Sequence, residues 1–112
     1  MFLDKVRKNY VIATPIDFDL IDRIALGLQA AKFDVDWSNA GVELLFDDAT
    51  VSININKNPP NSVKLAVRYF RGKSKELLKF AEDLDQVSFA DDKDLVKNIL
   101  TEVTETFERY FS

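Results

Sequence analysis

The chain has 112 residues, 46% hydrophobic and 30% charged, which is ordinary for one folded domain and too apolar for a disordered chain. It contains no cysteine and no histidine, which excludes disulfides and thiolate metal sites and removes the commonest general base and metal ligand. Its formal net charge is −4 at pH 7, yet residues 57–79 carry seven basic side chains and one acidic one.

Residues 2–13 support two alternative secondary structures. Leu3, Val6 and Tyr10 have helical spacing, whereas residues 10–13 suit a short strand. Because so few residues do not fix a period, the pattern leaves both alternatives open.

The first clear helix start follows this segment. Thr14 fits the N-cap, Pro15 fits the first helical position, and Asp17 places a carboxylate at the positive end of the helix. We expect the helix to continue to about Lys32, with an apolar stripe formed by Leu20, Ile21, Ile24, Leu28 and Ala31. Gly27 weakens this helix, and we expect close packing on the sheet to explain it, with a hinge as the alternative.

Residues 33–70 are predicted to form four β-strands, because apolar residues recur at every second position. The strands cover residues 33–37, 42–46, 51–55 and 63–69, and the segments between them are rich in Asn, Asp, Gly or Pro. Such short connections favour an antiparallel meander. Its apolar face is formed by Phe33, Val35, Trp37, Val42, Leu44, Phe46, Val51, Ile53, Ile55, Val63, Leu65, Val67 and Tyr69. Helices must cover that face, and we expect Trp37 to be largely buried beneath one of them.

Two further helices are expected after the sheet. Ser74 fits the N-cap of one that runs to about Val87, and residues 90–94 open another with acids at its favourable end. The apolar stripe of the last helix contains Leu95 or Val96, Ile99, Leu100, Val103, Phe107 and Tyr110 or Phe111. The sequence therefore predicts one α+β domain spanning residues 1–112, in which helices cover one face of a four-stranded antiparallel meander. Its element order is helix or strand, helix, four strands and two helices.

The chain contains no complete catalytic, cofactor-binding or metal-binding motif. Residues 72–74 follow a strand as the end of a phosphate-binding P-loop does, but Val67 occupies the position of the first glycine. Residues 34–38 alternate oxygen ligands as a calcium loop does, but Leu45 stands where the glutamate belongs. We therefore expect no enzymatic activity, no cofactor and no metal ion.

A basic segment within an acidic chain is the least ordinary feature of the sequence. The candidate anion-binding residues are Lys64, Arg68, Arg71, Lys73 and Lys75. Two of them would lie beside Phe70 on the outer face of the last strand, and cations with an aromatic side chain are typical of sites for single-stranded nucleic acid. The alternative is that acids of the later helices neutralise these cations within the molecule.

The C-terminal helix ends with three large apolar residues, Phe107, Tyr110 and Phe111, which form a candidate interface. The alternative is that they dock on the sheet of their own domain. The sequence thus favours a small acidic non-catalytic protein-interaction module that pairs with a second copy or with another protein. Weak binding of nucleic acid or another polyanion through residues 64–79 is the alternative. The chain has no signal-peptide pattern and no apolar run long enough for a membrane span, so we expect a cytoplasmic protein with no membrane partner.

Overall fold

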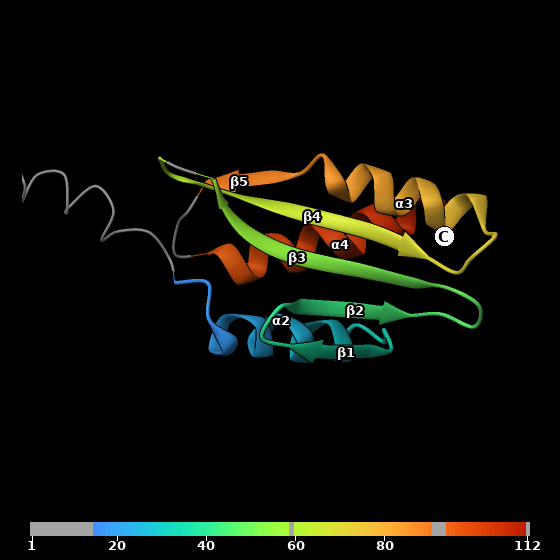
Figure 1. Cartoon of the computed structure of the whole chain (residues 1–112), viewed down its shortest axis with the longest axis horizontal. Coiled ribbons are helices and arrows are strands. Elements are labelled where there is room, and N and C mark those ends of the chain that lie inside the picture. Colours follow the sequence, from blue (N-terminus) through green and yellow to red (C-terminus); the bar gives the residue numbers. More distant parts are fainter. Residues whose placement is uncertain (1–14, 59, 91–93, 112) are drawn as a thin grey trace, which may run out of the picture.

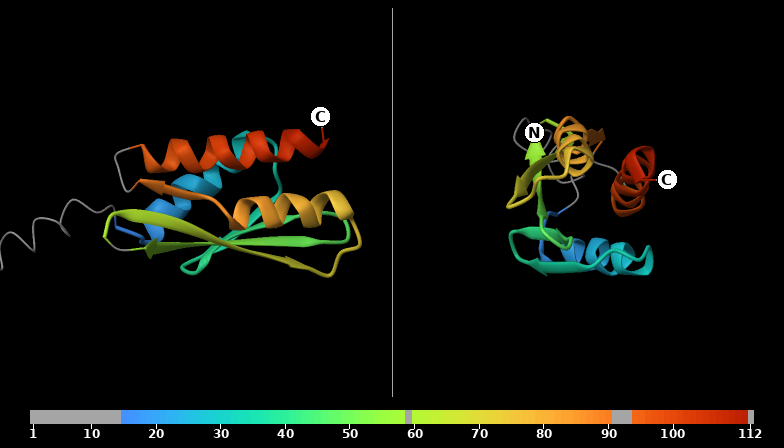
Figure 2. Two further views of the ribbon diagram at one scale, coloured as in Figure 1. Left: turned by 90° about the horizontal axis from the view of Figure 1, so that it is seen from above. Right: turned by 90° about the vertical axis from the view of Figure 1, so that its right-hand side faces the viewer.

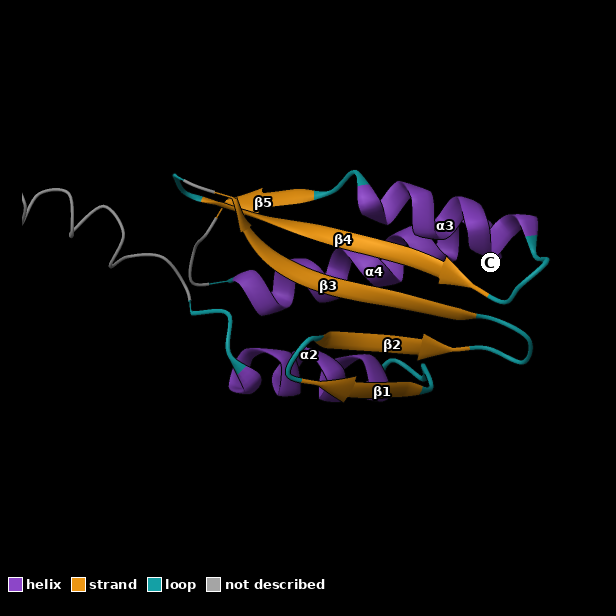
Figure 3. Ribbon diagram, viewed as in Figure 1, coloured by secondary structure: helices purple, strands orange, loops and turns teal. Residues whose placement is uncertain are grey.

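In the part of the chain that the structure describes, five antiparallel strands form one sheet, and their order across the sheet is their order along the chain (Figure 1). The computed structural model describes residues 15–58, 60–90 and 94–111, so the alternatives for residues 2–13 lie outside the described residues. The elements are α2 (Phe18–Ala30), β1 (Val35–Ser38), β2 (Gly41–Leu45), β3 (Thr50–Asn58), β4 (Ser62–Phe70), α3 (Lys75–Asp85), β5 (Ser88–Ala90) and α4 (Leu95–Phe111). Figure 3 distinguishes the helices from the strands, and Figure 2 shows all the helices of this described part on one face of the sheet. The α+β class and the antiparallel sheet are confirmed.

The strand register places the predicted apolar residues on the face that the helices cover. Val42 lies opposite Trp37 and Ile53, and Ile53 in turn lies opposite Val67. A slip of one residue would turn every apolar side chain of the slipped strand to the solvent face, so the apolar face itself fixes the register. The fully buried residues of the sheet include Val42, Leu44, Val51, Val63 and Leu65.

Trp37 is less buried than the sequence predicts, and its neighbours Phe33 and Val35 are likewise only partly buried. Their strand, β1, lies at the edge of the sheet, so each side chain has a neighbouring strand on one side only. Trp37 still contacts a helix, because its Nε1 donates a hydrogen bond of 3.1 Å to Asp22 on α2.

Among the described residues the sheet has five strands, not the four predicted. The segment after α3 forms β5, which pairs with the start of β4 through Val63 and Phe89. Only three residues take part, which is too short for an alternating pattern to be recognised in the sequence. The edge of β4 continues past the short β5. There the Asp85 side chain accepts a hydrogen bond of 2.8 Å from the backbone N–H of Val67, which protects the uncovered edge.

The two helix starts expected on either side of the sheet have different outcomes. Ser74 caps α3 as predicted, since its Oγ accepts from the backbone N–H of Leu77 at 3.2 Å. The expected start of α2 at Pro15 is wrong, because the helix begins at Phe18 and Asp17 is its N-cap. Both Thr14 and Asp17 are good capping residues, and Thr14 lies outside the described part.

Close packing explains Gly27 as predicted, but the packing is against α4 and not against the sheet. A Cβ atom at this position would lie 2.5 Å from Cδ1 of Leu100. The glycine therefore lets α2 and α4 approach each other closely over the sheet.

Candidate functional site: an acid-rimmed aromatic groove

An aromatic cluster lies at the end of the molecule where α4 finishes. Phe107 is at its centre, with ring centroids 5.0 Å from Phe33, 6.0 Å from Phe46 and 5.5 Å from Phe80. Phe33 and Phe46 flank the β1–β2 hairpin, and Phe80 lies on α3 with no exposed surface. Such ring pairs contribute about 0.5–1.5 kcal/mol each beyond the area they bury, so the cluster holds the end of α4 on its own domain.

A groove of about 790 Å³ opens over this cluster. Its volume falls within the roughly 300–1,000 Å³ of typical ligand pockets. It is formed where the end of α2, the turn between β2 and β3, the start of α3 and the end of α4 meet. We call it the aromatic groove, and its lining residues are Ala31, Lys32, Phe33, Asp34, Leu45, Phe46, Asp47, Asp48, Leu77, Thr104, Phe107 and Glu108.

The rim of the aromatic groove is negatively charged, although its floor is aromatic. Its exposed carboxylates are those of Asp34, Asp47, Asp48 and Glu108, and Lys32 is its cation. None of the four carboxylates forms an ion pair with any residue that the structure describes. Unpaired carboxylates around an apolar floor favour a ligand that brings both positive charge and apolar side chains.

The three candidate interface residues differ in their surroundings. Phe107 packs in the cluster described above, and the Tyr110 hydroxyl donates a hydrogen bond to Asp83 on α3. This hydrogen bond, followed by partial burial and the negative charge of Asp83, raises the pKa of Tyr110 above its ordinary value. Phe111 stacks on Phe107 at 4.5 Å and remains 42% exposed, so it extends the apolar floor to the surface.

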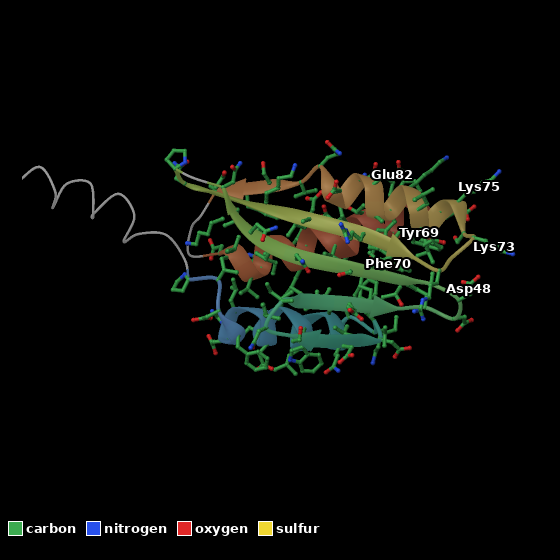
Figure 4. All side chains as sticks on the ribbon, in the orientation of Figure 1. Asp48, Tyr69, Phe70, Lys73, Lys75 and Glu82 are labelled. Atoms are coloured by element: carbon green, nitrogen blue, oxygen red, sulfur yellow. The ribbon has the colours of Figure 1, made fainter. Side chains whose placement is uncertain are left out.

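The structure separates the five candidate anion-binding residues. Lys64 lies opposite Asn56 near the β5 end of the sheet, and Arg68 lies opposite Ser52 further along β4. Arg71, Lys73 and Lys75 follow at the other end of β4, where Figure 4 labels the two lysines. Lys64 and Arg71 are seven residues apart along an extended strand, which corresponds to about 23 Å.

A compact loop holds the basic residues at the start of α3. The Tyr69 hydroxyl accepts a hydrogen bond of 2.9 Å from the backbone N–H of Ser74, and Gly72 packs against the Tyr69 ring. Arg71 and Lys73 are exposed and make no ion pair with a described residue, so the acids of α3 and α4 do not neutralise them here.

Sequence reasoning found Phe107 but missed the aromatic groove around it. Its signal in the sequence is two short segments in which phenylalanine precedes aspartate, at residues 33–34 and 46–48. These segments lie next to each other because Leu45 donates its backbone N–H to the carbonyl of Asp34 at 2.9 Å. No local pattern indicates that α4 completes the site.

The chain matches no family model, no curated protein and no solved structure. Within the described ranges, no helix combines the length and apolar character needed to cross a bilayer. The same residues contain no cluster of acids that could hold a metal ion.

Proposed function

We propose that this protein is a non-catalytic protein-interaction module that binds a cationic, apolar peptide segment of another protein in the aromatic groove. The observation that carries the proposal is the combination of an aromatic floor with four rim carboxylates that form no ion pair with any described residue. The floor removes apolar side chains from water, and the rim attracts and orients their basic neighbours. A cytoplasmic location is part of this proposal and rests on the sequence alone.

A synthetic peptide tests this directly. The probe is a fluorescent amphipathic peptide of about 14 residues with lysines on one helical face and Leu and Phe on the other. Binding is measured by anisotropy, and we expect affinity to fall as salt increases because exposed charges are screened. A matched peptide with glutamate in place of lysine should not bind.

Charge reversal on the rim identifies the binding surface. We expect Asp47→Lys/Asp48→Lys to weaken probe binding about tenfold, since exposed charge pairs are worth about 0.2–1 kcal/mol each and attraction becomes repulsion. The control Glu43→Lys/Glu82→Lys makes the same change in net charge at exposed positions outside the groove. Equal loss in both variants, or no binding by the parent protein, would exclude the groove as a docking site.

Self-association is a second form of the same proposal. Phe111 provides exposed aromatic surface beside the groove, and a second copy could bury it. Sedimentation over a range of concentrations should then show a dimer that Phe111→Ser dissociates. A protein that stays monomeric at high concentration would leave a foreign partner as the remaining form.

Weak polyanion binding is a second candidate function, favoured by cations at the start of α3 that form no ion pair with the part of the chain that the structure describes. The proposed binding surface contains fewer residues than the sequence predicts, because Arg71, Lys73 and Lys75 lie together and Lys64 lies apart from them. We expect a single-stranded oligonucleotide to bind at low salt and to lose affinity steeply as salt rises. Amide NMR shifts should centre on residues 71–75 and disappear in Arg71→Glu/Lys73→Glu. An absence of binding at low salt would eliminate this function.

A further inference from the structure

The sheet has a second face, turned away from the helices, which no element of the described part covers (Figure 1, Figure 2). We call it the open face, and it consists of the strand side chains that alternate with the buried ones. A solvated face is ordinary for an antiparallel sheet. This one nevertheless carries two large apolar side chains, Leu45 and Phe70, which are each 41% exposed. Thr50 of β3 pairs with both of them, so the three residues form one row across β2, β3 and β4.

A second row on the open face carries opposite charges at its two ends. Ser52 of β3 pairs with Glu43 on β2 and with Arg68 on β4. Asp36 on β1 pairs with Glu43 and adds a second acid at the same end. Glu43 and Arg68 are exposed, and neither forms an ion pair with a residue that the structure describes. They lie two strands apart, at about 10 Å, so the row presents an acidic end and a basic end.

A twofold axis that runs along β3 between two copies makes both rows complementary. Rotation about this axis turns one open face onto the other, places β4 over β2 of the second copy and keeps each residue in its own row. Arg68 then faces the partner's Glu43, Phe70 faces the partner's Leu45, and each contact occurs twice. A twofold axis across the strands would instead place β4 over the partner's β4 and bring Arg68 toward the partner's Lys64. The charges therefore favour the axis along β3.

We propose that the open face binds a second copy of this chain, with Arg68 and Phe70 against the partner's Glu43 and Leu45. The inference does not rest on the aromatic groove, which lies at another surface. Since β3 and β4 have nine residues each, the three facing strands present at most about 14 Å by 30 Å, or about 400 Å² per copy. So small an area is typical of weak, transient association, so the dimer should form only at high protein concentration.

Charge reversal at either end of the charged row tests the proposal in the whole chain. Sedimentation from about 20 μM to 1 mM at physiological salt, where net charge is screened beyond about 8 Å, should show the parent dimerising. We expect Glu43→Arg or Arg68→Glu to raise the dissociation constant about tenfold or more, because each substitution enters the dimer twice and replaces attraction by repulsion. The controls Glu82→Arg and Lys79→Glu make the same charge changes at exposed positions of α3 and should leave association unchanged.

A mixture of the two variants tests the symmetry itself. In a mixed dimer of Glu43→Arg with Arg68→Glu, both contacts join an arginine to a glutamate. The equimolar mixture should therefore associate as the parent does, although each variant alone is largely monomeric. The double variant Glu43→Arg/Arg68→Glu should also regain the association of the parent. Circular dichroism checks that each variant is folded, and no gain in association on mixing folded variants would overturn the inference.

The apolar row distinguishes this dimer from one built at the end of α4. Leu45 also borders the aromatic groove, so Phe70 is the residue to substitute. Phe70→Ser should dissociate the dimer, whereas Phe111→Ser should leave it intact. The reverse result would assign association to the end of α4 and overturn this inference. A parent that stays monomeric at 1 mM would overturn it as well, and peptide binding in the aromatic groove would still be decided by its own probe.

Discussion

The contact between Trp37 and Asp22 holds the edge strand β1 against α2. The indole N–H donates to the Asp22 carboxylate at 3.1 Å, and the ring is half-buried against the core. Full burial would make Trp37→Ala cost about 3–5 kcal/mol. Because part of the ring is already exposed, we expect about 2–3 kcal/mol, of which the hydrogen bond contributes about 1 kcal/mol.

A double-mutant cycle separates the hydrogen bond from the packing. We expect Trp37→Phe and Asp22→Ala each to lower the free energy of unfolding by about 1 kcal/mol, and the double variant to cost less than their sum. Urea unfolding followed by far-UV circular dichroism is the suitable assay, because Trp37 is the one tryptophan and its replacement removes the fluorescence signal.

Leu26→Ala is the matched control, since this α2 side chain is 50% exposed and its loss should stay within about 0.5 kcal/mol. A Trp37→Ala protein as stable as its parent would refute the docking of β1 on α2. Strict additivity of Trp37→Phe and Asp22→Ala would refute the hydrogen bond alone.

Three further changes probe the groove end of the molecule. Phe107→Ala should cost about 2–4 kcal/mol in urea unfolding because it removes the centre of the aromatic cluster, and a cost below about 1 kcal/mol would contradict that cluster. Tyr110 has a raised pKa in the folded state, mainly through its hydrogen bond to Asp83, so its stabilising contribution is present below about pH 10 and is lost as pH rises through the folded pKa. As pH rises through the folded pKa of Tyr110, the melting temperature should therefore change less with pH for Tyr110→Phe than for the parent. Gly72→Ala should destabilise the domain by about 1–3 kcal/mol in the same urea assay, because a Cβ there would collide with the Tyr69 ring, and an unchanged midpoint would contradict that packing.

The parts of the fold that the sequence predicted are those determined by neighbours in the chain. Alternation identified the buried face of β2, β3 and β4, because a strand's side chains point to opposite faces at each step. Ser74 was identified as a cap because it contacts Leu77, which is only three residues away in the sequence. In each of these cases a local pattern carries the whole physical cause.

The parts that the sequence did not predict depend on contacts between distant segments. β5 exists because β4 offers it an edge, which no three-residue pattern reveals. Phe107 was identified as an apolar residue near the end of a helix. The sequence does not show whether Phe33 and Phe46 or a partner would cover it. The groove combines residues from two helix ends, a turn and the start of α3, so its shape follows from the tertiary fold alone.

The acidic and basic surfaces lie close together, and this makes the two proposed functions separable. Asp48 is in the β2–β3 turn and Lys73 is in the loop before α3 (Figure 4). The two segments pack closely, as shown by Gly72, where an added Cβ would lie only 2.6 Å from Cβ of Ala49. At physiological salt each charge acts over about 8 Å, so the rim acids lower the positive potential of the basic loop. Asp47→Lys/Asp48→Lys should therefore weaken binding of the cationic peptide and strengthen binding of an oligonucleotide at the same time. A change of the same sign for both ligands would mean that the two do not use these adjacent surfaces.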